Sequence, residues 1–502
     1  MSRPLLKPCF RERAQVDVDP NQSSRNRCGE SSKAEYSDRV RCPPLVLEKG
    51  LLADMELQTP AALARKYSAP VPRYTSYPTA PHFTPRVGEL QYIRWLDDLA
   101  DGAEISLYVH IPYCHELCWY CGCNTKAARR YEPVAEYLRY LDAEIANIAV
   151  VVPQKHRVTH IHWGGGSPNV LAPFGIASLA HALRRAFNVR PEAQFSVEID
   201  PRHIEPDQIR AFCRAGVTRV SLGVQDFDEE VQAAIGRRQS FAKTKAAIDA
   251  FREGGVGSTN IDLMYGLPNQ TRRSIDQTLK HVLALDPDRI AAFGYAHLPA
   301  RLKHQRVIDE EALPDVVERY AQSRRISRRL EASGYVRVGL DHFAKPSDRL
   351  VKGPRFRNFQ GYTTDNASAL IGIGSSSIGR FPQGYVQNAT PVGDYIRRIR
   401  NFGLATVRGI ELSTDDRVRG YAIERLMCEG IFSRDEMERR FGSAAGPIIA
   451  EAELLVRTDP DGLITASPDG FTLTEIGKPF VRAICACFDA YFETGTTRDV
   501  YT

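Results

Sequence analysis

Residues 105–123 decide how the rest of the chain is interpreted: Ile105-Ser-Leu-Tyr-Val-His-Ile-Pro-Tyr-Cys-His-Glu-Leu-Cys-Trp-Tyr-Cys-Gly-Cys123. The run Ile105 to Ile111 is apolar and rich in strand-forming residues, and it ends at Pro112, so it predicts a β-strand. The cysteines that follow therefore leave the C-terminal end of a strand. In α/β barrels this is the end at which active sites lie.

The thiols of this stretch predict a metal site. Cys114, Cys118 and Cys121 have the spacing C-x3-C-x2-C, with Cys123 two positions further on. Thiolates suit iron–sulfur clusters or zinc. Structural zinc usually takes four ligands from two separated knuckles, and four donors in one short loop would be strained around a single ion, so zinc is the weaker alternative. Three thiols can hold three irons of a cubane and leave a fourth iron without a protein ligand. Thiols that merely fill the core are weaker still.

Length and composition limit the classes of protein to which this chain can belong. The chain has 502 residues, 43% hydrophobic and 25% charged, which is enough for a large core and more than one domain. Its net charge is +5 and its basic residues are spread along the chain, which disfavours nucleic acid as a partner and suits an acidic small molecule. No apolar run reaches the ~18 residues that span a bilayer, and no secretory segment is present, so we expect no membrane insertion. The odd count of 11 cysteines favours a reducing compartment, and we expect the cytoplasm.

Five segments are expected. Residues 1–54 lack apolar periodicity and predict a disordered extension, too acidic for a transit peptide and consistent with an overlong gene start ahead of Met55. Residues 55–104 hold a helix and an extended arm, Pro72–Thr79, which is either a packing strap or a cover on the barrel mouth. Residues 105–300 form the barrel core, residues 301–405 extend it, and residues 406–502 form a mainly helical domain with a strand-like Gly470–Leu473.

The fold class expected is α/β, a partial (β/α)6 barrel of the TIM type. Short β-branched runs alternate with amphipathic helical stretches at spacings that fit parallel strand–helix units. The six strands predicted are Ile105–Ile111, Val158–Trp163, Gln194–Ile199, Arg219–Val224, Thr259–Met264 and Arg289–Tyr295.

Polar residues at or after these strands indicate a shared site. A glycine run, Gly164–Gly166, follows the second strand and lets backbone approach a ligand closely. Glu198 lies near the end of the third strand, Gln225 and Arg237 follow the fourth, and Asp262 lies in the fifth. One such residue would more often be a structural partner, but several that converge on the same barrel face predict a site. The remaining cysteines after residue 200 lie in apolar helical contexts and are expected to be buried small hydrophobes: Cys213, Cys428, Cys485 and Cys487.

From about Tyr67 to Tyr491 the chain resembles the oxygen-independent coproporphyrinogen III oxidases of the radical S-adenosylmethionine superfamily. The motifs that carry the resemblance are Arg73-Tyr-Thr-Ser-Tyr-Pro-Thr79, His110-Ile-Pro-Tyr-Cys114, Cys118–Cys123, His162-Trp-Gly-Gly-Gly166, Gly223-Val-Gln-Asp-Phe227, Asp262-Leu-Met-Tyr-Gly-Leu-Pro268, Tyr295-Ala-His-Leu-Pro299 and Asn358-Phe-Gln-Gly-Tyr-Thr363.

The resemblance implies roles for particular residues. It assigns a [4Fe–4S] cluster to Cys114, Cys118 and Cys121, with Cys123 as an extra thiol beside it. It implies catalytic roles for the three ligands, Glu198 and Gln360. The positions similar to contacts of S-adenosylmethionine are Tyr108, Tyr120, Gly165, Gly166, Ser167, Glu198, Gln225, Arg237 and Asp262, while Ala296 and Ile378 resemble contacts of a second S-adenosylmethionine, with Phe359 nearby.

The implied reaction is the oxidative decarboxylation of two propionates of coproporphyrinogen III to vinyl groups in haem or chlorophyll synthesis. Two S-adenosylmethionine molecules per substrate, a reductant, a separate electron acceptor and a monomeric enzyme are expected. Two other classes stay open, a haem chaperone and a haem-cleaving radical enzyme. The Arg73–Thr79 arm and Cys123 favour the oxidase over the chaperone, and the arm also disfavours the haem-cleaving enzyme.

Overall fold

A computed structural model describes residues 59–152 and 155–492, and a mixed sheet built around β1 (Glu104–Ile111) organises it. Six strands of this sheet are parallel and adjacent, and they confirm the six predicted strands with ends that differ by a few residues. They are β1, β4 (Arg157–Gly165), β5 (Asn188–Ile199), β6 (Arg219–Gln225), β7 (Ser258–Tyr265) and β8 (Arg289–Gly294). All six therefore end at one edge, as the barrel prediction requires.

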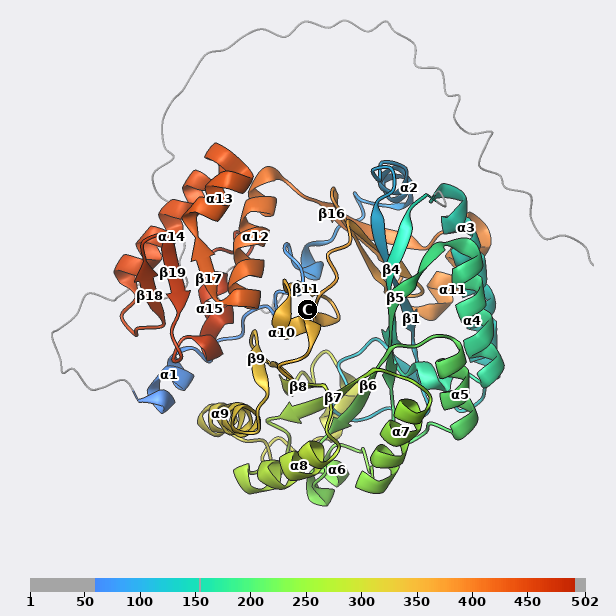
Figure 1. The fold of residues 1–502 in the computed structure, drawn as a ribbon, viewed down its shortest axis with the longest axis horizontal. Coiled ribbons are helices and arrows are strands. Elements are labelled where there is room, and N and C mark those ends of the chain that lie inside the picture. The colour runs from blue at the N-terminus through green and yellow to red at the C-terminus, as the bar shows by residue number, and fades with distance from the viewer. Residues whose placement is uncertain (1–58, 153–154, 493–502) are drawn as a thin grey trace, which may run out of the picture. The chain divides into compact units, whose positions relative to one another are not determined.

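Helices connect these strands and cover one side of the sheet, as Figure 1 shows for the helices after β1, β4, β5 and β6. They form where apolar residues recur at helical spacing: Ile176, Leu179 and Leu183, for example, are all buried. Side-chain caps mark several starts, such as Ser240 and Thr271. The connecting helices are α3 (Glu132–Val151), α4 (Pro173–Ala186), α5 (Pro206–Arg214), α6 (Glu229–Ala234), α7 (Phe241–Glu253), α8 (Arg272–Ala284) and α9 (Val316–Ala332).

Strands from the second half of the chain extend both edges of the sheet. β13 (Ala369–Ile373) pairs in parallel with β1, with Ile105 opposite Ala369. On its other side lie antiparallel strands, and beyond β8 the sheet ends in a further antiparallel pair. These strands are β14 (Ile378–Phe381), β15 (Gly384–Asn388), β16 (Thr406–Glu411), β10 (His342–Ala344) and β9 (Val336–Val338). The sequence analysis assigns residues 406–411 to the C-terminal domain, but in the structure these residues form β16 of the main sheet.

The C-terminal module follows β16 and has its own core, in which Phe471 and Phe488 are fully buried. The predicted strand Gly470–Leu473 is β19, at the centre of a small antiparallel sheet. Figure 1 shows this module gathered around that sheet. Its elements are α12 (Thr414–Glu429), β17 (Ile431–Ser433), α13 (Arg434–Phe441), α14 (Gly446–Thr458), β18 (Ile464–Ser467), β19 and α15 (Val481–Ala486).

The arm at residues 72–79 contains no helix or strand, as expected, and it packs on the C-terminal module. Tyr74 and Tyr77 are buried in the core of that module. The Tyr74 hydroxyl donates to Asp489 at 3.1 Å, and Arg357 donates to the Tyr74 carbonyl at 3.1 Å. The arm also contacts the main sheet, where the Arg73 guanidinium lies 5.3 Å from the ring centroid of Phe293 at the end of β8. Through these contacts the arm acts as a packing strap on the C-terminal module.

The remaining α-helices and strands of the described residues connect these parts. They are α1 (Pro60–Lys66), α2 (Glu89–Asp97), β2 (Tyr113–Cys114), β3 (Lys126–Ala127), α10 (Arg349–Lys352), β11 (Phe356–Asn358), β12 (Gly361–Thr363) and α11 (Val392–Phe402). The expected extension 1–54, with Cys9, Cys28 and Cys42, lies outside the described residues, as does Met55. Cys428 and Cys485 are buried as predicted, whereas Cys213 and Cys487 are half-buried. None of the helices described here is long and apolar enough to cross a bilayer.

Candidate functional site

The cysteine loop lies between β2 and β3 and is held in place by distant segments of the chain. The backbone N–H of Trp119 donates to the Ile235 carbonyl at 3.0 Å, beyond β6. Gln305 Nε2 donates to the Tyr120 carbonyl at 2.9 Å, and His304 Nε2 lies 2.6 Å from the Cys121 carbonyl oxygen. Both of these residues follow β8 in the 3₁₀ turn Lys303–Val307. The loop is thus fixed over the C-terminal edge of the parallel strands.

The thiols differ in their surroundings. Cys118 is buried, Cys114 and Cys121 are half-buried and Cys123 is exposed. The Thr125 hydroxyl lies 3.3 Å from Cys114 Sγ, and burial raises the pKa of Cys114 to about 12. The Cys123 thiol lowers the pKa of Cys121 to about 7 through a hydrogen bond, and the Cys123 N–H lies 3.4 Å from the same sulfur.

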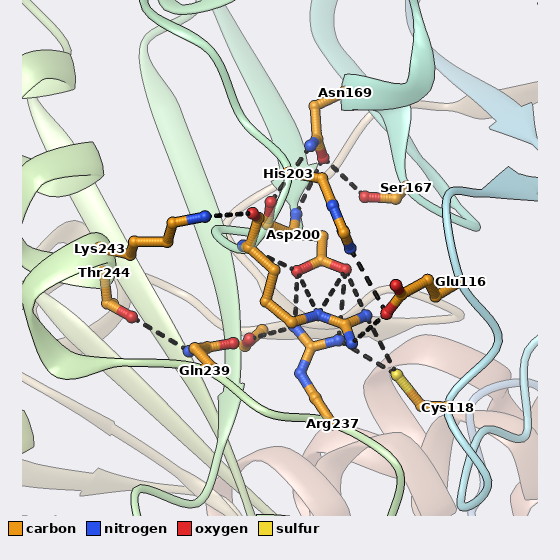
Figure 2. A network of polar contacts seen from close by, with 12 residues as sticks. Glu116, Cys118, Ser167, Asn169, Asp200, His203, Arg237, Gln239, Lys243 and Thr244 are labelled. Carbon is orange, nitrogen blue, oxygen red and sulfur yellow. Dashed lines mark hydrogen bonds and ion pairs between the residues drawn. The ribbon is translucent and has the colours of Figure 1, made fainter.

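Cys118 is bordered by two arginines that share one buried carboxylate. Arg202 Nη2 and Arg237 Nη1 each lie 3.3 Å from Cys118 Sγ. Asp200 accepts from Arg202 at 2.7 Å and from Arg237 at 3.1 Å. Figure 2 shows Asp200, Arg237 and Glu116 near Cys118. Burial opposes ionisation of Asp200, but the two guanidinium groups outweigh it and hold its pKa well below the usual range.

Glycines let the turn after β4 approach the cysteine loop. A Cβ on Gly166 would overlap the Tyr113 carbonyl oxygen and lie 2.5 Å from Thr125 Oγ1. Gly165 has φ +108°, a region that favours glycine, and a Cβ there would lie 2.6 Å from the His110 ring. Backbone contact between this turn and the loop therefore depends on the absence of side chains.

These features test whether the residues fit an iron–sulfur cluster. Within residues 59–152 and 155–492 no group of three His, Cys, Asp or Glu side chains is close enough to hold a single metal ion. A cubane is larger, because each thiolate binds its own iron, so the donors themselves decide the fit. The donors are three cysteines on one loop, one of them facing two cationic side chains. Soft thiolates beside N–H and hydroxyl donors suit such a cluster.

Two of the predicted polar residues lie in the parallel sheet, Glu198 near the end of β5 and Asp262 inside β7. Glu198 Oε1 lies 3.0 Å from His162 Nε2, and Glu198 Oε2 accepts from the Gly165 N–H at 3.2 Å. Burial would raise the pKa of Glu198, but these partners lower it. Asp262 accepts from the Ser221 hydroxyl at 2.9 Å and from Asn260 Nδ2 at 2.8 Å. Burial, and to a lesser degree the charge of Glu198, raises the pKa of Asp262 to about 6.

Two further predicted residues have distinctive conformations or contacts. Gln225 adopts φ +67°, which is rare outside glycine. The Tyr108 hydroxyl lies 3.1 Å from His110 Nδ1, and its ring stacks on His162 with centroids 5.7 Å apart.

Other predicted site residues are engaged differently. The Ser167 hydroxyl donates to Asn169 Oδ1 at 2.6 Å, so it takes part in a buried network. Arg237 is occupied at both Nη atoms, but its buried Nε has no hydrogen-bond acceptor among the described residues. The Ala296 carbonyl accepts a hydrogen bond from Gln305 Nε2 at 3.2 Å. Gln360 lies between β11 and β12, and Ile378 begins β14, both half-buried.

Some residues of this site were missed by sequence reasoning. Asp200 and Arg202 directly follow β5, so their position after a strand was a usable signal. His304 and Gln305 lie in a segment without a motif, and no local pattern in the sequence indicates that they bond the cysteine loop.

Comparison with known proteins agrees with this geometry. The family description "Radical SAM superfamily" matches residues 108–282. The oxygen-independent coproporphyrinogen III oxidase of Bradyrhizobium diazoefficiens is 45% identical over 429 residues, 85% of this chain and 95% of that protein. The enzyme of the same name from Escherichia coli is 39% identical over 435 residues, 86% of this chain and 95% of that protein.

A solved structure supports the fold over the same range. The Escherichia coli coproporphyrinogen III oxidase, described as a radical SAM enzyme, superposes with a TM-score of 0.80 at 38% identity. The match covers 84% of this chain and 98% of that one. With this identity over most of both sequences, the chain belongs to the oxygen-independent coproporphyrinogen III oxidase family of the radical S-adenosylmethionine superfamily.

Proposed function

We propose that this protein converts coproporphyrinogen III to protoporphyrinogen IX without oxygen, as a step of porphyrin synthesis leading to haem or chlorophyll. The observation that carries the proposal is the cysteine loop fixed at the C-terminal edge of the parallel strands, with Glu198 next to the last residue of β5 and Asp262 inside the neighbouring part of the sheet, in β7. The names of relatives at 38–45% identity supply the substrate.

Cys114, Cys118 and Cys121 are the cluster ligands in this proposal, and Cys123 is a neighbouring thiol. When bound, the [4Fe–4S] cluster and S-adenosylmethionine supply the one-electron chemistry that removes a hydrogen atom from the substrate. The contacts proposed for S-adenosylmethionine are Tyr108, Tyr120, Gly165, Gly166, Ser167, Glu198, Gln225, Arg237 and Asp262.

In this proposal, the residues of this chain bind and orient S-adenosylmethionine. Arg237 Nε is a buried donor without an acceptor among the described residues, which suits a ligand carboxylate. The Glu198 and Asp262 carboxylates accept hydrogen bonds and suit hydroxyl or ammonium groups of the same ligand. The close contact between the glycine turn and the loop leaves little room for water there.

The reaction balances for each propionate when its side chain loses carbon dioxide, one hydrogen atom and one electron to become a vinyl group. Two propionates require two S-adenosylmethionine molecules, and we place the second near Ala296 and Ile378, with Phe359 and the catalytic Gln360 beside it. A reductant and an electron acceptor are separate molecules.

We propose that the protein acts as a monomer in the cytoplasm, with residues 105–300 as core and 301–405 as the substrate region.

The test is an anaerobic assay with reconstituted protein, dithionite, S-adenosylmethionine and coproporphyrinogen III, reading 5′-deoxyadenosine and protoporphyrin together. Wild type should form both products and Cys118→Ala neither. Cys213→Ala, at a half-buried helix cysteine, is the matched control and should keep both.

The other two classes predict different outcomes. If S-adenosylmethionine is cleaved while coproporphyrinogen III persists, the substrate assignment is wrong. Stoichiometric haem binding without turnover would indicate a chaperone, and a ring-opened product would indicate haem cleavage. The names of the relatives do not favour either class.

A further inference from the structure

Cys118 differs from the other proposed ligands in the charge of its hydrogen-bond donors. Its sulfur lies 3.3 Å from a nitrogen of Arg202 and 3.3 Å from a nitrogen of Arg237. The donor beside Cys114 is the hydroxyl of Thr125, and the backbone donor beside Cys121 is the N–H of Cys123. Hydrogen bonds from charged groups are roughly twice as strong as those between neutral groups. One thiolate of the three would therefore be stabilised more than the others.

Asp200 fixes Arg202 in this position. Arg202 Nε donates to Asp200 Oδ1 at 3.0 Å, and its Nη2 donates to Oδ2 at 2.7 Å. The Arg202 backbone N–H also donates to Asp200 Oδ1, at 3.1 Å. The side chains of Arg202 and Asp200 are 6% and 8% exposed, so water screens the group poorly. The fork of the guanidinium is thereby held with Nη2 directed at both Cys118 and Asp200.

The group carries an excess of positive charge. Two buried guanidinium groups face one buried carboxylate, and the second carboxylate near Arg202, Glu116 at 3.3 Å, is 62% exposed and therefore screened. Reduction of an iron–sulfur cluster adds one negative charge, which nearby cations and hydrogen bonds to sulfur stabilise. The network therefore favours the reduced state of a cluster bound through Cys118.

We propose that Arg202, held by Asp200, is a positioning residue that raises the reduction potential of the cluster through its hydrogen bond to Cys118. This inference rests on the proposed function, because it requires the cluster at Cys118. It assigns to Arg202 a role in electron uptake by the enzyme. Arg237 contributes in the same direction, but its Nε and its predicted contact with S-adenosylmethionine make it unsuitable for a clean test.

The chain offers a matched control in Arg289 and Asp348. This pair is bidentate, 2.6 Å apart, and its side chains are 6% and 8% exposed, the same as Arg202 and Asp200. Arg289 begins β8, at the strand end opposite the cysteine loop. Replacing Arg289 removes an equally buried ion pair without touching the cluster loop.

The experiment is a redox titration of the reconstituted protein, with the midpoint of the cluster read by electron paramagnetic resonance without S-adenosylmethionine. The variants are Arg202→Met, Arg202→Gln, Arg202→Lys and Arg289→Met, each compared at equal iron and sulfide content. We expect a more negative midpoint in Arg202→Met and an intermediate value in Arg202→Lys, which keeps the charge but not the fork. Arg289→Met should keep the wild-type midpoint. Its melting temperature should fall by about as much as that of Arg202→Met.

Each outcome decides the matter. A wild-type midpoint in Arg202→Met or a shift of the same size in Arg289→Met would overturn the proposal. If Arg202→Met does not fold, Arg202→Lys carries the test, and an unshifted midpoint there together with an unshifted midpoint in Arg202→Gln overturns it. Absence of any cluster in wild type would instead contradict the proposed function.

Discussion

Glu198 Oε2 accepts the backbone N–H of Gly165 at 3.2 Å, so the carboxylate at the end of β5 holds the glycine turn that ends β4. Its other oxygen faces His162 Nε2 at 3.0 Å. One side chain therefore links two neighbouring strands at the edge where the cysteine loop lies, and both of its oxygens are in use.

Glu198→Gln should weaken both the turn and cofactor binding. The amide keeps one acceptor oxygen for the Gly165 N–H but loses the negative charge, and it stays paired with His162 only if the ring nitrogen accepts from the amide N–H, so bonds to a charged group worth about 1.5–3 kcal/mol are weakened. We expect binding of S-adenosylmethionine to reconstituted protein to weaken about tenfold, since ~1.4 kcal/mol is a factor of ten. Calorimetric titration at equal cluster content measures this. Glu192→Gln, an exposed position on the same strand, should bind as wild type does; equal weakening in both variants would contradict the role of Glu198.

Gly166→Ala should impair loading of the cluster. The new Cβ would overlap the Tyr113 carbonyl oxygen and lie 2.5 Å from Thr125 Oγ1, so the turn and the loop must separate. Such overpacking costs about 1–3 kcal/mol. We expect lower iron and sulfide content per protein after reconstitution under identical conditions. The control is Gly122→Ala, within the cysteine loop, where an added Cβ has nothing within 4 Å. Full loading of Gly166→Ala would show that the contact is dispensable.

The stability of the protein should depend on pH through Glu144. This buried side chain of α3 accepts hydrogen bonds from the Gly374 N–H, the Asn388 amide and the Tyr395 hydroxyl, each at 2.7 Å. Burial raises its pKa from 4.5 to about 7, against the lowering effect of these bonds. Because the folded pKa exceeds the unfolded one, its contribution is complete below pH ~4.5, falls as pH rises to ~7, and is constant above that.

Glu144→Gln should remove this part of the pH dependence. Between about pH 5 and 7 the free energy of unfolding of wild type should fall relative to the variant by on the order of 2–3 kcal/mol. Urea denaturation at several pH values gives the free energy of unfolding as a function of pH for both proteins. The two proteins are compared by the slope of this free energy against pH, because the altered hydrogen bonds add only a constant offset. Glu136→Gln, exposed on the same helix, should leave the wild-type slope unchanged. Parallel curves for wild type and Glu144→Gln would refute the prediction.

Arg357 should anchor the arm. It donates to the carbonyls of Tyr74 at 3.1 Å and Arg73 at 3.2 Å, and its guanidinium lies 4.5 Å from the ring centroid of Tyr362. In Arg357→Met we expect faster tryptic cleavage after Arg73, because the arm loses two hydrogen bonds worth ~1 kcal/mol each. Mass spectrometry of timed digests measures the rate.

A neighbouring arginine serves as the control for the arm. Arg355 donates to the carbonyls of Leu350 and Cys428 and pairs with Glu429, but not with the arm, among the contacts of the described residues. Arg355→Met should therefore be cleaved after Arg73 at the wild-type rate. Equal acceleration in both variants would mean that general loosening, and not the contact with the arm, controls cleavage.

The sequence by itself determined the local elements and the chemistry of the loop. The six parallel strands were predictable because a strand buried between helices and neighbours leaves a short apolar, β-branched run. Gly470–Leu473 is a short run that includes the strand-forming residues Phe471 and Thr472, and Phe471 is its buried residue. The cysteine spacing is a property of one short segment, and so are the glycines after β4. Such signals need no knowledge of distant contacts.

Tertiary structure alone decided which distant groups meet. β13 is the parallel neighbour of β1 although Ala369 and Ile105 are far apart in the chain, and neither short apolar run by itself specifies which strand lies beside it. Arg202 reaches Cys118 across 84 positions, and Gln305 reaches Tyr120 across 185. Periodicity reports only whether a residue is buried. The partner of a buried charge is set by the packing of whole elements, and this packing places Asp200 and its arginines beside one sulfur of the loop.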